Sequence, residues 1–310
     1  MNDNDLNVSV KNIKKKNVKY KSTLSKMAPY LFLMPWLIGV ITLQLGPIIF
    51  SFITSFTQYN LGNNMSFIGM DNYIQAATDP LVIQSLINTV KYVFITVPMK
   101  LVFALFIAYI LNSKIKGIGA YRTVYYLPSI IGGSVGVAIL WKALFLNSGM
   151  INLMLAKIGI TGPSWLGDPN YSLFTVSLLA VWQFGSSMVI FLAGLKQIPS
   201  ELYEAAQVDG ASKVKCFFNV TIPLLTPIIF FNLIMQIIGA FQTFSGPFVI
   251  YGGQYGPLNS VLLIVMYIYN QAFQVFDMGY ASAISWILLA IIGTFTFILF
   301  KSEDKWVFYN

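Results

Sequence analysis

The chain has 310 residues, of which 56% are hydrophobic and only 10% are charged, and its mean hydropathy is +0.70. These values lie outside the range of soluble globular domains. The formal charge is +8, and the single cysteine, Cys216, excludes an internal disulfide. We therefore predict that lipid surrounds most of the folded chain.

The chain begins with a basic segment, residues 1–27, that is rich in Asn and Lys. The apolar stretch that follows, about 28–54, is too long for the core of a signal peptide and has no small-residue cleavage site. We therefore expect a cytoplasmic tail over 1–27, followed by a membrane span that is retained.

Six segments are apolar over the roughly 20 residues that a helix needs to cross a bilayer. They are approximately residues 28–54, 85–111, 123–146, 173–195, 224–250 and 278–300. Short polar connectors separate them, and no separate soluble domain is visible. The predicted fold is all-α, a polytopic transmembrane helical bundle with six spans over residues 28–300.

The basic residues fall almost entirely on one side of these spans. On that side lie seven lysines before the first span, then Lys114, Lys116, Arg122, Lys196, Lys213, Lys215, Lys301 and Lys305. The opposite connectors carry only Lys157. Because basic connectors stay in the cytoplasm, both termini are predicted to be cytoplasmic, including the tail 301–310. The net charge thus indicates membrane topology and no nucleic acid partner.

Residues 258–276 form a seventh apolar region that we do not count as a span. Its uninterrupted core, residues 261–269, is too short to cross a bilayer. A further span would also move Lys301 and Lys305 outside, against the charge distribution. We expect either a re-entrant helix or a helix on the outer surface.

Several kinds of chemistry are absent from the sequence. There is no histidine, only one cysteine and no acidic residue deep within a predicted span, which disfavours a metal site, a catalytic triad or a proton relay. The phosphate-binding pattern G-x-x-x-x-G-K-[ST] is also missing. We therefore predict that the chain is not an enzyme and binds no cofactor, and that any ATP is held by another subunit.

The connector after the fourth predicted span, residues 196–223, is long and polar for a simple linker. Pro199 and Ser200 indicate the start of a helix, and Gly210 can end it. Ala205 and Ala206 give that helix a flat face suited to a groove in another protein. A second amphipathic piece then leads into the fifth span.

The residues of this connector resemble the EAA loop of binding-protein-dependent ABC importer permeases. The matching positions are Glu204, Ala205, Ala206, Asp209, Gly210, Ala211, Phe217 and Pro223, with Val220 in place of the more usual isoleucine. Six spans and a length near 300 residues are similar to the sugar-importer branch, specifically to the larger maltose and glycerol-3-phosphate permease subunits. The resemblance covers nearly everything after the basic tail.

This resemblance implies a bacterial cytoplasmic membrane protein that works within a larger complex. The expected partners are a second homologous permease subunit, a dimer of ABC ATPases and an extracellular or periplasmic solute-binding protein. ATP and Mg would be bound by the ATPases, and the matching residues above would contact them, with Glu204 and Gly210 foremost.

Candidate substrate-pathway residues are amides and aromatics in the later apolar segments, since sugars present hydroxyl groups and apolar faces. They are Trp182, Gln183, Asn232, Gln236, Gln242 and Tyr267, to which we add Lys100, a charge near the middle of the second span. Asn and Gln can instead bond neighbouring helices, and Lys100 can bond a carbonyl freed by Pro98.

Two alternatives stay open at this point. A glycerol-3-phosphate importer would differ mainly in a delivery protein that recognises phosphate. A secondary transporter or channel would work without an ATPase and would need some buried titratable site.

Overall fold

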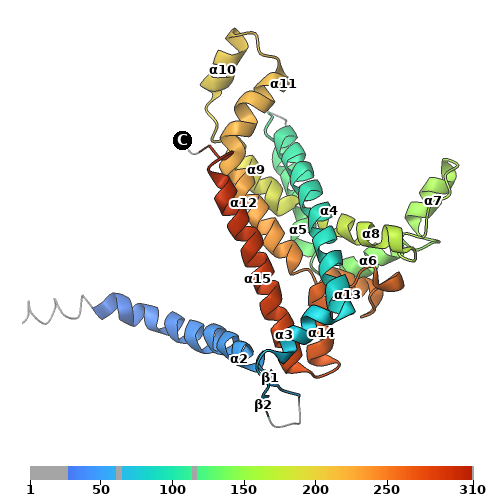
Figure 1. Cartoon of the computed structure of the whole chain (residues 1–310). Coiled ribbons are helices and arrows are strands. Elements are labelled where there is room, and N and C mark those ends of the chain that lie inside the picture. Colours follow the sequence, from blue (N-terminus) through green and yellow to red (C-terminus); the bar gives the residue numbers. More distant parts are fainter. Residues whose placement is uncertain (1–26, 61–64, 114–116, 309–310) are drawn as a thin grey trace, which may run out of the picture. The chain divides into compact units, whose positions relative to one another are not determined.

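The computed structural model describes residues 27–60, 65–113 and 117–308, and nearly all of its regular structure is helical (Figure 1). The chain divides into two compact units, Met1–Thr54 and Ser55–Asn310. The predicted basic tail lies outside the described residues except for its last position, Met27.

The described part of the first unit is one helical run, Met27–Thr54, of 28 residues. Its middle widens into a π-helix, η1 (Val40–Leu45), before α2 (Gly46–Thr54) completes it. At 1.5 Å per residue the run is about 42 Å long, enough to cross the hydrocarbon core. Most of its large apolar side chains are exposed, as a lipid-facing helix requires.

The first elements of the second unit do not belong to any candidate span. They are β1 (Thr57–Gln58), the antiparallel strand β2 (Ser66–Phe67) and α3 (Asp71–Thr78). Asn72 of α3 is buried, and its amide donates to the carbonyls of Ser55 and Thr57, each at 2.9 Å. These bonds hold the short hairpin on the helix.

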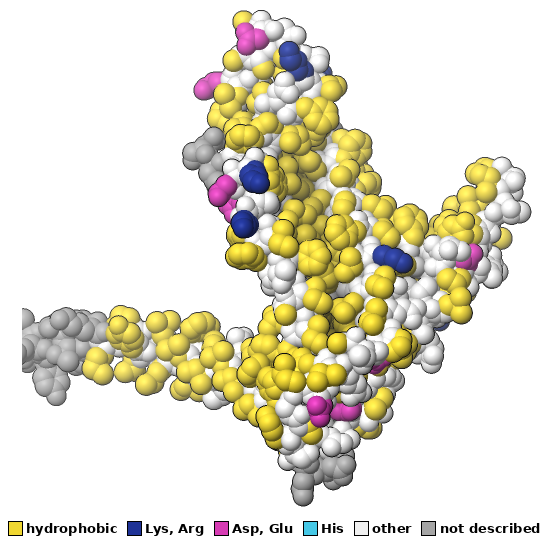
Figure 2. All heavy atoms as spheres, viewed as in Figure 1, with side chains coloured by type: hydrophobic (Ala, Val, Ile, Leu, Met, Phe, Trp, Pro, Cys, Tyr) yellow, Lys and Arg dark blue, Asp and Glu magenta, His cyan; other side chains and the backbone are white. Residues whose placement is uncertain are grey.

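Helix α4 lies at the centre of the second unit and packs against α8, α9, α12 and α14. The helices after α3 are α4 (Pro80–Leu111), α5 (Ile118–Ile131), α6 (Val135–Leu144), α7 (Met150–Lys157), α8 (Pro169–Trp182), α9 (Gly185–Leu195), α10 (Ser200–Val208), α11 (Lys213–Cys216), η2 (Phe217–Thr221), α12 (Ile222–Phe241), α13 (Ser245–Tyr251), η3 (Pro257–Asn259), α14 (Ile264–Phe273) and α15 (Met278–Glu303). The buried face of α4 includes Val93, Val97 and Ala104. Hydrophobic side chains also cover much of the visible outer face of this bundle (Figure 2).

Four helical runs of the described chain are long and apolar enough to cross a membrane. They are Met27–Thr54, Pro80–Leu111, Lys213–Tyr251 and Met278–Glu303, and two bent pairs of helices raise the number to six if each pair is one span. All six overlap the predicted segments. The protein is therefore an all-helical membrane protein with four to six candidate spans.

The third predicted span, 123–146, differs from a single crossing helix. Helices α5 and α6 meet there at an angle of 101°. The break falls at Gly132, Gly133 and Ser134, where Ser134 is extended and its hydroxyl oxygen accepts the backbone N–H of Val137 at 3.4 Å. The serine thus starts a new helix in a new direction, which the apolar composition of the segment conceals.

The region predicted as re-entrant or outer-surface, 258–276, contains the ten-residue helix α14. Such a helix is about 15 Å long, half of what a bilayer needs. It is attached to α4 from the side: the amide of Asn88 donates to the carbonyl of Asn259 at 2.8 Å, and Thr89 accepts the N–H of Ile264 at 2.9 Å. The start of α14 is buried in protein.

Asp79 ties three helices together at the start of α4. One carboxylate oxygen accepts the N–H of Leu81 at 2.8 Å, and the other accepts the hydroxyls of Tyr267 at 2.6 Å and Tyr280 at 2.8 Å. Burial raises the pKa of the Asp79 carboxyl, but these hydrogen bonds outweigh it, so that its pKa lies below the ordinary 3.8. Burial and the bond to Asp79 raise the pKa of the Tyr267 hydroxyl.

We expect Asp79→Asn to lower the free energy of unfolding by about 1–2 kcal/mol, because Asn still caps the helix but loses the charge that both tyrosines bond. Since the pKa of Asp79 is depressed in the folded state, this stabilisation is present above its ordinary pKa and is lost as the pH falls below about 4. The measurement is thermal unfolding of the purified protein at neutral and acidic pH.

Asp168→Asn is the matched control. Asp168 also caps a helix that begins with proline, and its carboxylate accepts the N–H of Asn170 at 2.8 Å, but no tyrosine hydroxyl of the described chain donates to that carboxylate. Equal destabilisation by the two substitutions would contradict the role given to the tyrosines.

Candidate functional site

Three interruptions in the spans surround one small cavity in the second unit. They are the breaks between α5 and α6, between α8 and α9, and between α12 and α13. The cavity has a volume of about 180 Å³ and is lined by Tyr92, Gly132, Gly133, Val176, Leu179, Ala180, Gln183, Thr243, Ser245, Gly246 and Pro247. Non-helical backbone within a membrane is tolerated where it is buried in protein or lines a cavity, and broken spans commonly form transport sites.

The first two breaks satisfy each other's backbone groups. The amide of Gln183 donates to the carbonyl of Gly132 at 3.0 Å, and the hydroxyl of Ser129 donates to the carbonyl of Gln183 at 3.1 Å. The same serine oxygen accepts the N–H of Ser186 at 3.0 Å. The bonds fix the two bent pairs against each other and leave polar groups along the cavity wall.

Two glycines allow this close approach. A Cβ at Gly132 would overlap both the side chain of Gln183 and the carbonyl of Pro128. A Cβ at Gly185 would lie 2.7 Å from the carbonyl of Tyr125. Small residues commonly let membrane helices approach in this way.

The chemistry of the wall is neutral and mixed. Gln183, Thr243 and Ser245 supply amide and hydroxyl groups, Tyr92 supplies an aromatic ring, and no lining residue is charged. Such a wall suits an uncharged ligand that carries hydroxyl groups and apolar faces.

The predicted pathway residues lie in different surroundings. Gln183 lines the cavity, and its neighbour Trp182 packs on Trp141 with ring centroids 6.2 Å apart. Gln242 is exposed at the end of α12, next to the cavity residue Thr243. These positions come together around the breaks.

The remaining candidates lie away from the cavity lining. Asn232 is fully buried on α12; its amide donates to the carbonyl of Ile228 at 3.1 Å, and its Oδ1 has no partner among the described residues. Gln236, one turn further on, is half-buried. Tyr267 bonds Asp79, and Lys100 is half-buried on α4.

Sequence reasoning missed Tyr92, Thr243 and Ser245 as wall residues, along with the lining role of Gly132 and Gly133. A usable signal was present, because small and polar residues interrupt three otherwise apolar segments at 132–134, 183–187 and 242–246. Interruptions of this kind predict broken spans.

A second candidate site is the loop that carries α10, at the opposite end of α12 from α13 (Figure 1). Glu201 lies in the first turn of α10, and Glu204 and Ala205 are exposed further along it, whereas Ala206 is half-buried. The exposed fractions of Leu202 and Val208 are 43% and 88%. Most residues of α10 are thus accessible to another protein.

A tight turn follows α10. Asp209 ends the helix, and Gly210 has φ +76°, a conformation that glycine adopts without strain. The N–H of Ala211 then donates to the carbonyl of Ala206 at 2.9 Å. The predicted residues from Glu204 to Ala211 thus form one helix and its terminating turn.

The other two predicted loop residues belong to the start of the fifth span. Phe217 packs edge-to-face on Tyr109 with centroids 4.9 Å apart, and Pro223 lies in the first turn of α12. Between the two parts, Tyr203 of α10 bonds the hydroxyl of Thr221 at 2.9 Å. That bond, which sequence reasoning missed, attaches the loop helix to the span.

No three His, Cys, Asp or Glu side chains of the described chain lie close enough to hold a metal ion.

Gly132→Ala should destabilise the protein by about 1–3 kcal/mol, because the added methyl overpacks the junction of the two breaks. Gly133→Ala is the control, since a Cβ there meets nothing within 4 Å and the backbone is unstrained. Thermal unfolding of the two purified variants gives the comparison. A similar unfolding midpoint for the two variants would contradict the prediction, because it would mean that the junction accommodates the added methyl group.

The family described as "Binding-protein-dependent transport system inner membrane component" matches residues 79–308. The "Probable ABC transporter permease protein YesP" of Bacillus subtilis (strain 168) is 51% identical over 286 residues, which are 92% of this chain and 93% of that protein. The "Arabinooligosaccharides transport system permease protein AraP" of the same organism is 34% identical over 280 residues, 89% of this chain and 88% of that protein.

The fold matches that of solved transporters. The crystal structure of a bacterial alginate ABC transporter in complex with an alginate pentasaccharide-bound periplasmic protein has a chain with a TM-score of 0.77, 23% identity, and coverage of 91% of this chain and 96% of that one. The family predicted from the loop motif is confirmed. The chain belongs to the inner membrane components of binding-protein-dependent transport systems: it is a multi-pass permease subunit of an ABC importer in the cytoplasmic membrane and not an enzyme itself.

Proposed function

We propose that this permease imports sugars or oligosaccharides and forms half of their translocation pathway, with a second homologous permease as the other half. The cavity at the broken spans carries the proposal, because its wall combines amide and hydroxyl groups, an aromatic ring and no charge. The relative AraP is named for arabinooligosaccharide transport, which supports the same substrate class.

The cavity also favours sugar over glycerol-3-phosphate. A phosphate group is normally held by Arg, Lys or several converging N–H groups, and no cation is among the lining residues. The described spans likewise contain no acidic residue at the cavity to serve as a proton or sodium site, which disfavours a secondary transporter.

The energy source in this proposal is ATP, bound with Mg by a dimer of ABC ATPases that contacts α10. An external solute-binding protein delivers the sugar to the opposite side. The match of residues 79–308 to the inner membrane components of binding-protein-dependent transport systems supports such a contact. Glu204, Ala205, Ala206, Asp209, Gly210 and Ala211 lie together on the same helix and turn, with Phe217 and Pro223 behind them.

Of the two carboxylates on α10, Glu204 rather than Glu201 is the one we propose to contact the ATPase. A helix dipole stabilises anions within the first turn, and only Glu201 lies there. Glu204 is exposed one turn later, where that stabilisation has decayed. A basic residue of the ATPase would explain a carboxylate at this position.

Helix α12 provides the mechanical link between the loop and the cavity. Its 20 residues are about 30 Å long. At one end, Tyr203 of the loop bonds Thr221, just before the helix begins; at the other end lies the break that contains the cavity residue Thr243. When ATP draws the ATPases together, displacement of α10 would tilt α12 and reshape the cavity.

Glu204→Ala should weaken binding of the ATPase by about 2–5 kcal/mol, because it leaves a partner cation buried without its carboxylate. Glu201→Ala is the matched control: it removes the same charge from the same helix, in the turn where the dipole alone would account for it. Copurification of the ATPase with each variant gives the measurement. If Glu201→Ala reduces ATPase copurification more than Glu204→Ala does, the two carboxylates act by stabilising α10, and the proposed contact of Glu204 is contradicted.

The function is tested with the chain reconstituted in lipid vesicles together with a partner permease and ATPase. We expect a sugar-loaded binding protein to stimulate ATP hydrolysis and sugar uptake, whereas the unloaded protein does so weakly. Uptake that proceeds without ATP would contradict the proposal. If only a binding protein loaded with glycerol-3-phosphate stimulates hydrolysis, glycerol-3-phosphate would replace sugar as the proposed substrate.

A further inference from the structure

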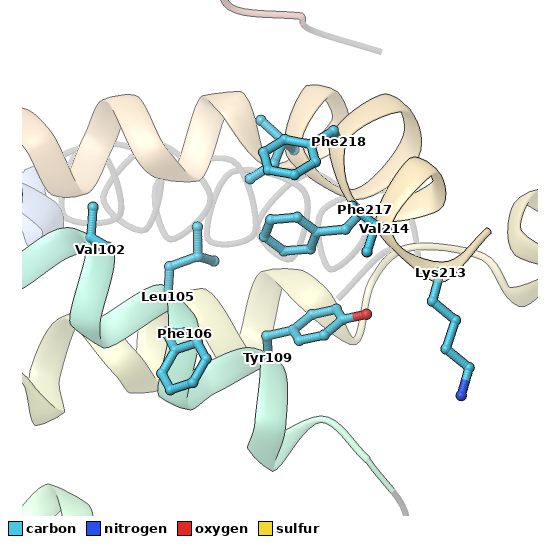
Figure 3. Close-up of a pocket in the computed structure, with 9 residues that line it drawn as sticks. Val102, Leu105, Phe106, Tyr109, Lys213, Val214, Phe217 and Phe218 are labelled. Carbon is cyan, nitrogen blue, oxygen red and sulfur yellow. The ribbon is translucent and has the colours of Figure 1, made fainter. Parts of the chain in front are cut away.

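An apolar groove of about 670 Å³ lies on the outside of the second unit, between the C-terminal part of α4 and the segment from α11 into α12 (Figure 3). One wall includes Val102, Phe106 and Tyr109, and the other includes Val214, Phe217 and Phe218. Its lining surface is almost entirely carbon except at one end. This groove is separate from the cavity at the broken spans.

The groove is short enough to fit within one leaflet of a bilayer. Tyr109 lies seven positions after Val102, so the groove extends about 10 Å along α4, compared with about 15 Å of hydrocarbon in one leaflet. The distribution of basic residues places this end of α4 at the cytoplasmic side. Val102 and Phe218 are 70% and 61% exposed, so the groove is open at its sides.

The shape of the walls argues against a packed helix as the occupant. Membrane helices that pack closely use Gly, Ala, Ser or Thr at the contact, and none of these is among the nine lining residues. Large aliphatic and aromatic side chains leave furrows that a flexible hydrocarbon chain fills better than a rigid helix does.

The cytoplasmic end of the groove is polar. The Tyr109 hydroxyl and Lys213 lie at this end, and the side chain of Lys213 extends away from the rings (Figure 3). Lys213 is exposed and forms no ion pair with a described residue. An ammonium and a phenol beside an apolar furrow complement a phosphate attached to an acyl chain.

We propose that the groove binds an anionic phospholipid of the cytoplasmic leaflet, with one acyl chain between α4 and η2 and the phosphate at Lys213 and Tyr109. This goes beyond the transport function, which does not require it. The bound lipid would brace the segment that carries Thr221, the anchor of the loop helix. The lipid would thereby affect the position of α10 at the proposed contact with the ATPase.

The test uses the complete complex in phosphatidylcholine nanodiscs that contain a minor fraction of a photoactivatable probe. The two probes are phosphatidylglycerol and phosphatidylcholine with identical diazirine-labelled acyl chains, and mass spectrometry maps the labelled peptides. We expect phosphatidylglycerol to label α4 and η2 about fivefold more than phosphatidylcholine does, the effect of one basic residue near an anionic headgroup. Lys213→Gln should abolish this difference.

Lys215→Gln is the matched control, because Lys215 lies on the same helix but does not line the groove. It should keep the full preference. Val102→Trp, at an exposed position of the wall, should reduce labelling by both probes in an assembled complex. Equal labelling by the two probes, an equal loss in Lys215→Gln, or cross-links from the groove to another protein chain would overturn the proposal.

Discussion

Every backbone group in a membrane must find a hydrogen-bond partner within the protein, and the second unit depends on how it meets this constraint at its broken helices. Ser129 and Gln183 bond across the two bent pairs, so each break supplies partners for the other. A polar wall can therefore exist within the spans without exposing unbonded groups to lipid. The cavity lies beside these paired breaks.

The same constraint explains how far the sequence could predict the fold. Hydrocarbon thickness demands about 20 apolar residues per span, so span number and approximate position follow from composition. The breaks were harder to predict, because Gly132 and Gly133 look like packing positions when only hydropathy is averaged. Contacts such as Asp79 with Tyr280 join residues 201 positions apart and leave no local signal.

The loop was predictable for the opposite reason. The signals for its helix are local, so its start at Pro199 and Ser200 and its end at Gly210 could be predicted from residue type. Glu204 and Pro223 were identified through the resemblance to the EAA loop. The bond between Tyr203 and Thr221 depends on how the chain folds back and was not predicted. Among the pathway candidates, Gln183 lines the cavity, whereas Tyr267 bonds Asp79, since an aromatic side chain in an apolar segment serves either purpose.

Together these features describe a permease in which one helix connects two sites. The loop at one end of α12 is exposed and bears apolar side chains, and the cavity at the other end is neutral and polar. The proposed lipid groove lies beside the loop end of α12. In the proposed mechanism, changes at the ATPase reach the cavity by tilting α12, with no charge moved through the spans.

The most direct test of this account is the accessibility of a cysteine at the cavity. Thr243→Cys would be introduced in a Cys216→Ser background, where the only native cysteine, which is buried, has been removed, and the complex would use cysteine-free partners. Modification by a membrane-impermeant thiol reagent would be measured from each side, with and without ATP trapped on the ATPases. The account predicts that trapping ATP shifts the reactive side from the cytoplasm to the exterior. Modification that is unchanged by ATP would contradict it.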